Sequence, residues 1–354
     1  MLHFFWTPYI FRRDSYDKYE ANNAEICKHA RRVLGRFTDV HLDSFNASRV
    51  TRNPADILLG HTSFDSVGGL ADDWVRDNAL EPGQPAHPNT YLMLPLLPEP
   101  VEEHKSWSPF MDSQLRGARL IFGICGDHWY ERIQALPADD MLGRVKDRIV
   151  RIDMGCEGHR FAPPRGYSQA SMRGLLHMSD LAPHKGFDLL LNSVAGTGAV
   201  LHAGSSALRA HPYQRVRLNG HEFVSLGWVD NTSAQQDRFI KDNCAFYIHA
   251  SSRDAQATAI LENCARGLVP MVTPESGFRS PYAIELTQDA EANRAIIARA
   301  LAMPQEEYER RSAGVVRQVL EQHSWDRIFT GIWERIQQDI AGRAAWAGRA
   351  GQAG

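Results

Sequence analysis

The feature that most constrains the fold is an alternation of short apolar runs with longer amphipathic stretches. Apolar runs of about four to eight residues predict buried strands, and apolar residues at helical spacing predict helices. The first part of the chain has such strands at 2–6, 38–42, 56–60, 90–97 and 119–124, and such helices at 17–35, 68–78, 109–117 and 127–135. The alternation predicts a mostly parallel sheet with helices on both faces.

The alternation is interrupted once and then restarts. A strand from 148 leads into a passage rich in Gly, Pro and Arg, which predicts a domain boundary near 153–170. Further strands follow at about 173–178, 198–202, 222–226, 244–249 and 269–272, with helices at 185–194, 233–242, 255–267, 289–301 and 304–321. We therefore predict an α/β fold of two doubly wound, Rossmann-like domains that face a central cleft.

The predicted boundaries divide the 354 residues into four parts. An N-terminal domain covers 1–153 and a C-terminal domain covers 154–323. A helix over 324–342 has apolar residues on one face and is expected to cross back to the N-terminal domain. The final segment, 343–354, is predicted to be disordered.

Composition excludes several classes of protein. The net charge of −3 provides no global field for nucleic acid. The five cysteines form no CxxC pair, so neither a zinc site nor a disulfide framework is indicated, and reduced thiols in a cytosol are expected. The first apolar run is too short for a secretion signal, and no run approaches the roughly 20 apolar residues of a membrane span. We expect a cytoplasmic protein.

The stretch 251–278 is the most informative about function. It predicts a loop, a helix over 255–267, a buried strand and a second loop, with Asp254 and Glu262 eight positions apart. The small first turn would leave backbone N–H groups reachable, and such a helix terminus binds anions. An ordinary buried helix fits the pattern equally well. Asp254 alone would be a normal N-cap, and Glu262 a normal solvated residue.

A second block, 177–191, predicts a strand, a loop and a helix that starts near Lys185. A lysine in such a loop can neutralise a phosphate. The alternative is a surface lysine in the first turn of a helix, where its charge would oppose the helix dipole.

Four blocks in order resemble the nucleotide-binding domain of GT-B glycosyltransferases, most closely the retaining glycosyltransferase family 4. They are GCEGHRFAP (155–163), HKGFDLLL (184–191), SLGWVD (225–230) and the 251–278 stretch. The resemblance covers about 150–340. In residues 1–150 only the strand–helix rhythm is similar.

The resemblance implies roles for individual residues. Glu262 would bind the donor ribose, Lys185 the donor diphosphate and Asp254 the transferred sugar. The other donor-binding positions are Gln256 and Ala257, through their backbone N–H groups, Ser179 and Gly227. Lys185 and Asp254 are also the predicted catalytic residues of this half, acting on the leaving diphosphate and the sugar.

The chain departs from the family pattern in three places. Asp254 replaces a Glu and is one methylene shorter. Ser179 stands where the family has an Arg, and Arg253 or Arg173 is a candidate substitute. The Gly-Gly loop after the first strand is missing, and His61 is the nearest candidate for the catalytic His of the N-terminal domain. A plain loop histidine is the more frequent explanation for His61.

The resemblance implies a retaining glycosyltransferase that moves a sugar from a nucleotide-sugar to a glycan, a lipid-linked or a small-molecule acceptor, without a metal cofactor. Two alternatives remain: a nucleotide-sugar epimerase of the same fold, and a non-catalytic module that binds glycan or partners another transferase. Four basic residues share a face of the helix at 17–35, namely Lys28, Arg31, Arg32 and Arg36. They could contact anionic lipid at the inner face of the membrane, although a solvated basic face is the more frequent case.

Overall fold

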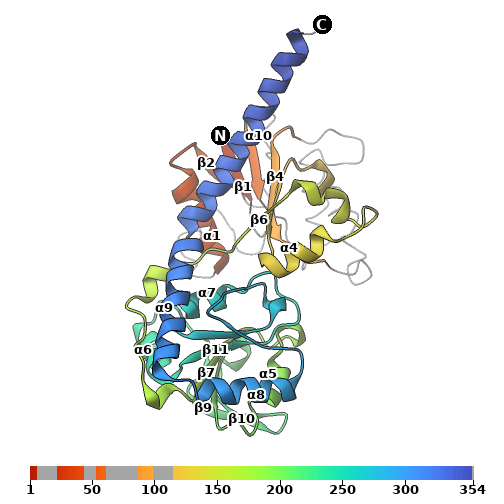
Figure 1. Cartoon of the computed structure of the whole chain (residues 1–354). Helices are drawn as coiled ribbons and strands as arrows, with labels where there is room; N and C mark the ends of the chain where they lie inside the picture. The colour runs from red at the N-terminus through yellow and green to blue at the C-terminus, as the bar shows by residue number, and fades with distance from the viewer. Residues whose placement is uncertain (6–21, 44–52, 61–86, 99–114, 353–354) are drawn as a thin grey trace. The chain divides into compact units, whose positions relative to one another are not determined.

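A computed structural model of the chain describes residues 1–5, 22–43, 53–60, 87–98 and 115–352. It divides into two compact units (Figure 1). The first unit contains Met1–Ile124, Tyr130–Asp153 and Trp325–Gly354. The second unit contains Cys125–Trp129 and Met154–Ser324.

The described part of the first unit contains a six-stranded parallel sheet in the order β2-β1-β3-β4-β5-β6. Its strands are β1 (Leu2–Phe5), β2 (Val40–Asp43), β3 (Ile57–Gly60), β4 (Thr90–Pro95), β5 (Ile121–Ile124) and β6 (Ile149–Ile152). Continuous burial of β3 and β5 is typical of strands that are covered on both faces. The predicted parallel sheet is confirmed, whereas the helices expected at 68–78 and over most of 109–117 lie outside the described residues.

Helix α1 (Asn22–Leu34) lies beside α10 (Trp325–Gln352) in the first unit (Figure 1). The ring of Trp325 stacks on His29 with 5.7 Å between centroids, and Phe329 meets the edge of Phe4 at 5.8 Å. The chain therefore returns at its end to the unit in which it began. Helix α4 (Gly126–Gln134) has its first residues in the second unit.

Residues 343–352 differ from the expectation of disorder, because α10 continues to Gln352. The segment 343–354 contains five Ala and two Arg, which are strong helix formers, together with three Gly, which are not. Arg343 also anchors this part of the helix by donating to Asn89 Oδ1 at 2.6 Å.

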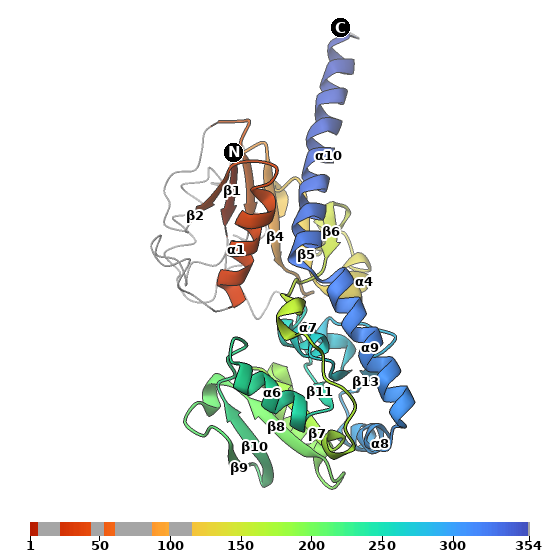
Figure 2. The same ribbon diagram turned by 90° about the vertical axis from the view of Figure 1, so that its left-hand side faces the viewer.

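The described part of the second unit contains a seven-stranded sheet in the order β13-β12-β11-β7-β8-β10-β9 (Figure 2). Its strands are β7 (Gly174–Met178), β8 (Val200–Gly204), β9 (Gln214–Leu218), β10 (His221–Gly227), β11 (Phe246–His249), β12 (Val269–Val272) and β13 (Ile284–Glu285). All but β9 are parallel. The parallel strands follow the doubly wound order, and the direction of winding reverses between β7 and β11.

The edge strand β9 was not predicted. It pairs with β10 across a two-residue turn in which Asn219 and Gly220 have φ of 49° and 83°. Positive φ at both central residues defines a type I′ turn, and Asn-Gly is its usual sequence signal. The charged residues of β9 do not form the apolar run that predicts a strand. The Asn-Gly dipeptide nevertheless predicts the hairpin.

Helices cover both faces of the second sheet. One face packs against α5 (Phe187–Val194) and α8 (Ala290–Leu301), which share a core with Leu175 and Ile248. The other packs against α6 (Ala234–Asn243), α7 (Thr258–Ala265) and α9 (Gln305–Gln322), which share a core with Leu176 and Tyr247. This two-sided packing leaves the ends of the strands as the place for functional loops.

Candidate functional site

Two loops meet where the sheet order reverses. One follows β7 and carries Lys185, and the other follows β11 and carries Asp254. The Oγ of Ser251 and the N–H of Ser252 donate to His184 O, at 2.8 and 2.9 Å. These two bonds tie the loops together at the carboxyl edge of the sheet, where ligands of this architecture bind.

Gly186 allows this close approach. Its φ is +74°, and a Cβ added there would lie 1.9 Å from Ala250 O. Neither the left-handed backbone nor the space admits a side chain.

A third loop, after β12, supports Asp254 from the other side. The Asp254 N–H donates to Glu275 O at 2.9 Å, and Trp129 Nε1 donates to Asp254 O at 2.7 Å. The backbone of Asp254 is thus fixed on both its N–H and its C=O.

The side chains of Lys185 and Asp254 form an ion pair. Lys185 Nζ lies 2.5 Å from Asp254 Oδ2, and the side chains are 22% and 12% exposed. His249 Nε2 lies 3.4 Å from the same oxygen. Burial alone would raise the pKa of Asp254, but the neighbouring His249 and the charge of Lys185 hold it below the ordinary value. The site therefore presents an ionised carboxylate beside a cation.

Two buried histidines lie beneath this pair. The rings of His177 and His249 stack at 5.6 Å with an interplanar angle of 16°. Burial, followed by the neighbouring His249, lowers the pKa of His177 to about 3, so His177 is neutral near neutral pH. The resemblance to family 4 implies no role for either histidine.

Glu262 lies on α7 and is only 5% exposed, so it is not the solvated residue of the simpler explanation. Burial, followed by the charges of Asp254 and Glu262, raises the pKa of the Tyr247 hydroxyl well above its ordinary value. Both carboxylates therefore lie within electrostatic reach of one buried hydroxyl group. The buried Arg266 lies within electrostatic reach of Glu262 and offsets its charge.

Gln256 and Ala257 differ from the expectation, because α7 starts at Thr258 and not at 255. Ala257 is the N-cap residue, with an extended backbone. The side chain of Gln256 accepts from the Met154 N–H and donates to Gly277 O. These contacts hold the residue in the loop, so neither residue is in the first turn of the helix.

The remaining predicted residues separate into those at the carboxyl edge and those elsewhere. Ser179 and Gly227 directly follow or end strands at this edge. Arg173 precedes β7 and lies at the opposite end of that strand, so it is not a substitute for the missing cation. Arg253 is next to Asp254 in the correct loop. His61 lies outside the described residues.

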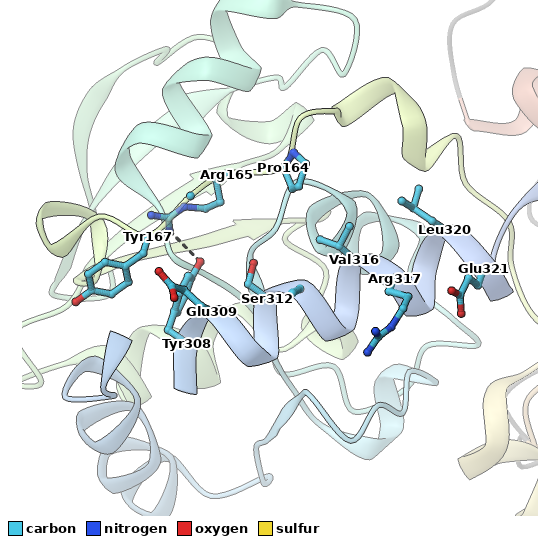
Figure 3. A pocket seen from close by; sticks show the side chains of 12 residues that line it. Pro164, Arg165, Tyr167, Tyr308, Glu309, Ser312, Val316, Arg317, Leu320 and Glu321 are labelled. Carbon is cyan, nitrogen blue, oxygen red and sulfur yellow. Dashed lines mark hydrogen bonds between the residues drawn. The ribbon is translucent and has the colours of Figure 1, made fainter. Parts of the chain in front are cut away.

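A pocket of about 520 Å³ lies elsewhere in the second unit, between α9 and residues 164–167 (Figure 3). It shares no lining residue with the Lys185–Asp254 site. The guanidinium of Arg165 donates to Cys244 O and Tyr308 Oη, and Tyr308 and Ser312 both donate to Gly267 O. These polar groups join α9 to the sheet, which is a structural role.

Two further features concern ligands and membranes. Within the described residues, no group of three or more His, Cys, Asp or Glu side chains is placed to hold a metal ion. No described helix combines the length and apolar character needed to span a bilayer. On α1, Arg32 and Arg36 pair with Asp326 of α10, so half of the predicted basic face also serves packing within the first unit.

No protein-family model matches the chain, and no curated protein matches it in sequence. Solved structures do match its fold. A trehalose-6-phosphate synthase, OtsA, has a TM-score of 0.61 at 10% identity, with 96% of this chain and 99% of the other covered. HepE from Anabaena, in complex with UDP and glucose, has a TM-score of 0.61 at 10% identity, with coverage of 96% and 100%.

A third structure is an alpha-glucosyltransferase in complex with UDP-glucose and DNA. It has a TM-score of 0.58 at 12% identity, with 95% of this chain and 99% of the other covered. The match extends over nearly the whole length of each chain, so the chain has the GT-B fold of two Rossmann-like domains. At these identities the likeness establishes the fold and leaves the activity to be argued from the site.

Proposed function

We propose that the protein is a glycosyltransferase that uses a nucleotide-sugar donor bound by the second unit. The observation that carries this proposal is the Lys185–Asp254 pair at the reversal of the sheet order. Support also comes from the similar structures that contain UDP or UDP-glucose. Lys185 supplies the positive charge for a diphosphate, and Asp254 supplies an acceptor for sugar hydroxyls.

In the proposed reaction the bond between the sugar anomeric carbon and the diphosphate oxygen breaks, and its electron pair stays on the diphosphate. The acceptor hydroxyl forms the new bond to that carbon, and its proton passes to the departing diphosphate oxygen. Lys185 stabilises the charge that develops on the leaving diphosphate, a contribution that is often the largest in such reactions. We further propose retention of configuration and no metal requirement, as the resemblance to family 4 implies.

The acceptor is proposed to be a glycan, a lipid-linked or a small hydroxyl compound in the cytoplasm. Lys28 and Arg31 on the exposed side of α1 are the residues proposed for a peripheral contact with anionic lipid. We assign none of the described side chains of the first unit to acceptor binding.

The test is donor turnover, followed as release of nucleoside diphosphate from a panel that includes UDP-glucose and GDP-mannose. Lys185→Ala should lower kcat about a hundredfold, because it removes a charge that acts on the leaving group. Glu262→Gln should raise KM about tenfold, because the amide replaces a charged acceptor for the ribose hydroxyls.

Three outcomes contradict the proposal. Full activity in both variants would show that the site lies elsewhere. A changed sugar still attached to its nucleotide would identify an epimerase. Absence of binding to every nucleotide in the panel would identify a non-catalytic module.

A further inference from the structure

His249 has no assigned role, yet its side chain contacts the proposed donor site directly. It ends β11, is fully buried, and places Nε2 3.4 Å from Asp254 Oδ2. Its neighbours along the chain, Ile248 and Ala250, are apolar. Neither ring nitrogen has a hydrogen-bond partner among the described residues, so the 3.4 Å approach to Asp254 is the one polar contact described for this buried imidazole.

The ring of His249 is held in one orientation by its surroundings. It stacks between His177 and Tyr247, with centroid distances of 5.6 and 6.2 Å and interplanar angles of 16° and 15°. Both neighbours are themselves fixed, since His177 Nδ1 lies 3.0 Å from Ile248 O and Tyr247 Oη donates to Met178 O at 3.0 Å. The stack thus holds the ring with Nε2 3.4 Å from Asp254 Oδ2, a contact within ion-pair distance that lacks the alignment of a hydrogen bond.

The two contacts to Asp254 converge on one oxygen. Lys185 and His249 both approach Oδ2, and within the described residues no group donates to Oδ1. A lysine ammonium has three donors, and one is used here. Lys185 can therefore meet a phosphate oxygen without releasing Asp254, while Oδ1 stays available as an acceptor.

We propose that His249 is a positioning residue that holds Asp254 by Oδ2, so that Oδ1 accepts a hydroxyl of the donor sugar. This inference rests on the proposed function and deepens it. Asp254 would then select donor sugars that carry a neutral hydroxyl where they contact Oδ1. An acidic sugar group at this position would be repelled by the ionised carboxylate.

The test compares UDP with UDP-glucose, and GDP with GDP-mannose, by isothermal calorimetry on the full-length protein. In the pair that the wild-type protein binds, His249→Phe should weaken the nucleotide-sugar about tenfold and leave the free diphosphate unchanged, because only the sugar meets Asp254. His249→Gln should restore much of the loss, since its amide nitrogen can replace Nε2 as a donor.

A matched control is His202→Phe. His202 is also a buried histidine in the same sheet, on β8, and has no contact with Asp254. The His202→Phe variant should keep the wild-type ratio of nucleotide-sugar affinity to diphosphate affinity, even if its thermal unfolding midpoint is lower.

Two results would overturn the inference. One is an equal loss of diphosphate and nucleotide-sugar affinity in His249→Phe, and the other is identical ratios for the Phe and Gln variants. Either would reduce His249 to a packing residue while the proposed function stood. Failure of the wild-type protein to bind any of the four compounds would instead overturn the proposed function, and this inference with it.

Discussion

At the scale of single residues, the site depends on a partly buried ion pair. Lys185 and Asp254 come from loops 69 positions apart and meet at 2.5 Å. A pair that is withdrawn from water in this way loses hydration, and removal of either partner leaves an uncompensated charge. The two residues should therefore respond to mutation as a unit.

The charge of Asp254 should make stability depend on pH. Its pKa is lower in the folded protein, so its contribution is present above the unfolded value near about 4 and is lost as the pH falls through the folded value. Asp254→Asn should be less stable than the wild type by about 2 kcal/mol at neutral pH. Urea unfolding at several pH values should show this difference shrink below about pH 4. A difference that stays constant or grows in acid would contradict the assigned ion pair.

The sequence identified both members of this pair but not their contact. Lys185 and Asp254 stand in recognisable blocks, whereas a contact between separate loops depends on the strand order. No sequence block identifies His249. A histidine inside an apolar strand has the same sequence context whether it supports a site or fills a core.

At the scale of elements, the close approach of two loops depends on a glycine. Gly186 and Gly196 both have left-handed φ, at +74° and +75°. A Cβ at Gly186 would lie 1.9 Å from a backbone oxygen, whereas a Cβ at Gly196 would have no heavy atom within 4 Å. Alanine substitutions at these two glycines therefore separate the cost of backbone strain from the cost of a steric clash.

Gly196→Ala should cost about 1 kcal/mol, the usual penalty for a left-handed alanine. Gly186→Ala should cost clearly more, because the backbone must also move, and it should weaken nucleotide binding by displacing Lys185. Chemical denaturation and nucleotide titration of both variants would check this. Equal destabilisation with unchanged binding in both would refute the role of Gly186.

Regular elements were largely predictable, and their ends were not. The apolar runs identified β7, β11 and β12. The start of α7 was misplaced because Ala255 and Gln256 are compatible with a helix, and only the tertiary contacts of Gln256 hold them in a loop.

At the scale of the molecule, the chain forms two units, and α10 returns it to the first. Phe329 is fully buried and contacts Trp325 and Phe4, whereas Trp346 on the same helix is 69% exposed. The returning helix therefore contributes to the core of the first unit through only part of its length.

Phe329→Ala should destabilise the first unit by about 3–5 kcal/mol, as large-to-small changes in a core do. Trp346→Ala should change stability by less than about 0.5 kcal/mol. Hydrogen exchange would localise the loss of protection to the first unit in Phe329→Ala. Equal loss in both units, or an equal effect of the two variants, would contradict this division.

The most direct test of the donor site is a calorimetric titration of UDP and GDP into the wild type, Lys185→Ala and Arg215→Ala. Arg215 is a control cation in the second unit, 79% exposed and distant in the fold on the edge strand β9. The wild type and Arg215→Ala should bind one nucleotide equally, and Lys185→Ala should bind it at least about tenfold more weakly, the loss expected for a charge-assisted contact. Equal affinity of all three proteins, or no binding by the wild type, would contradict a donor site at Lys185.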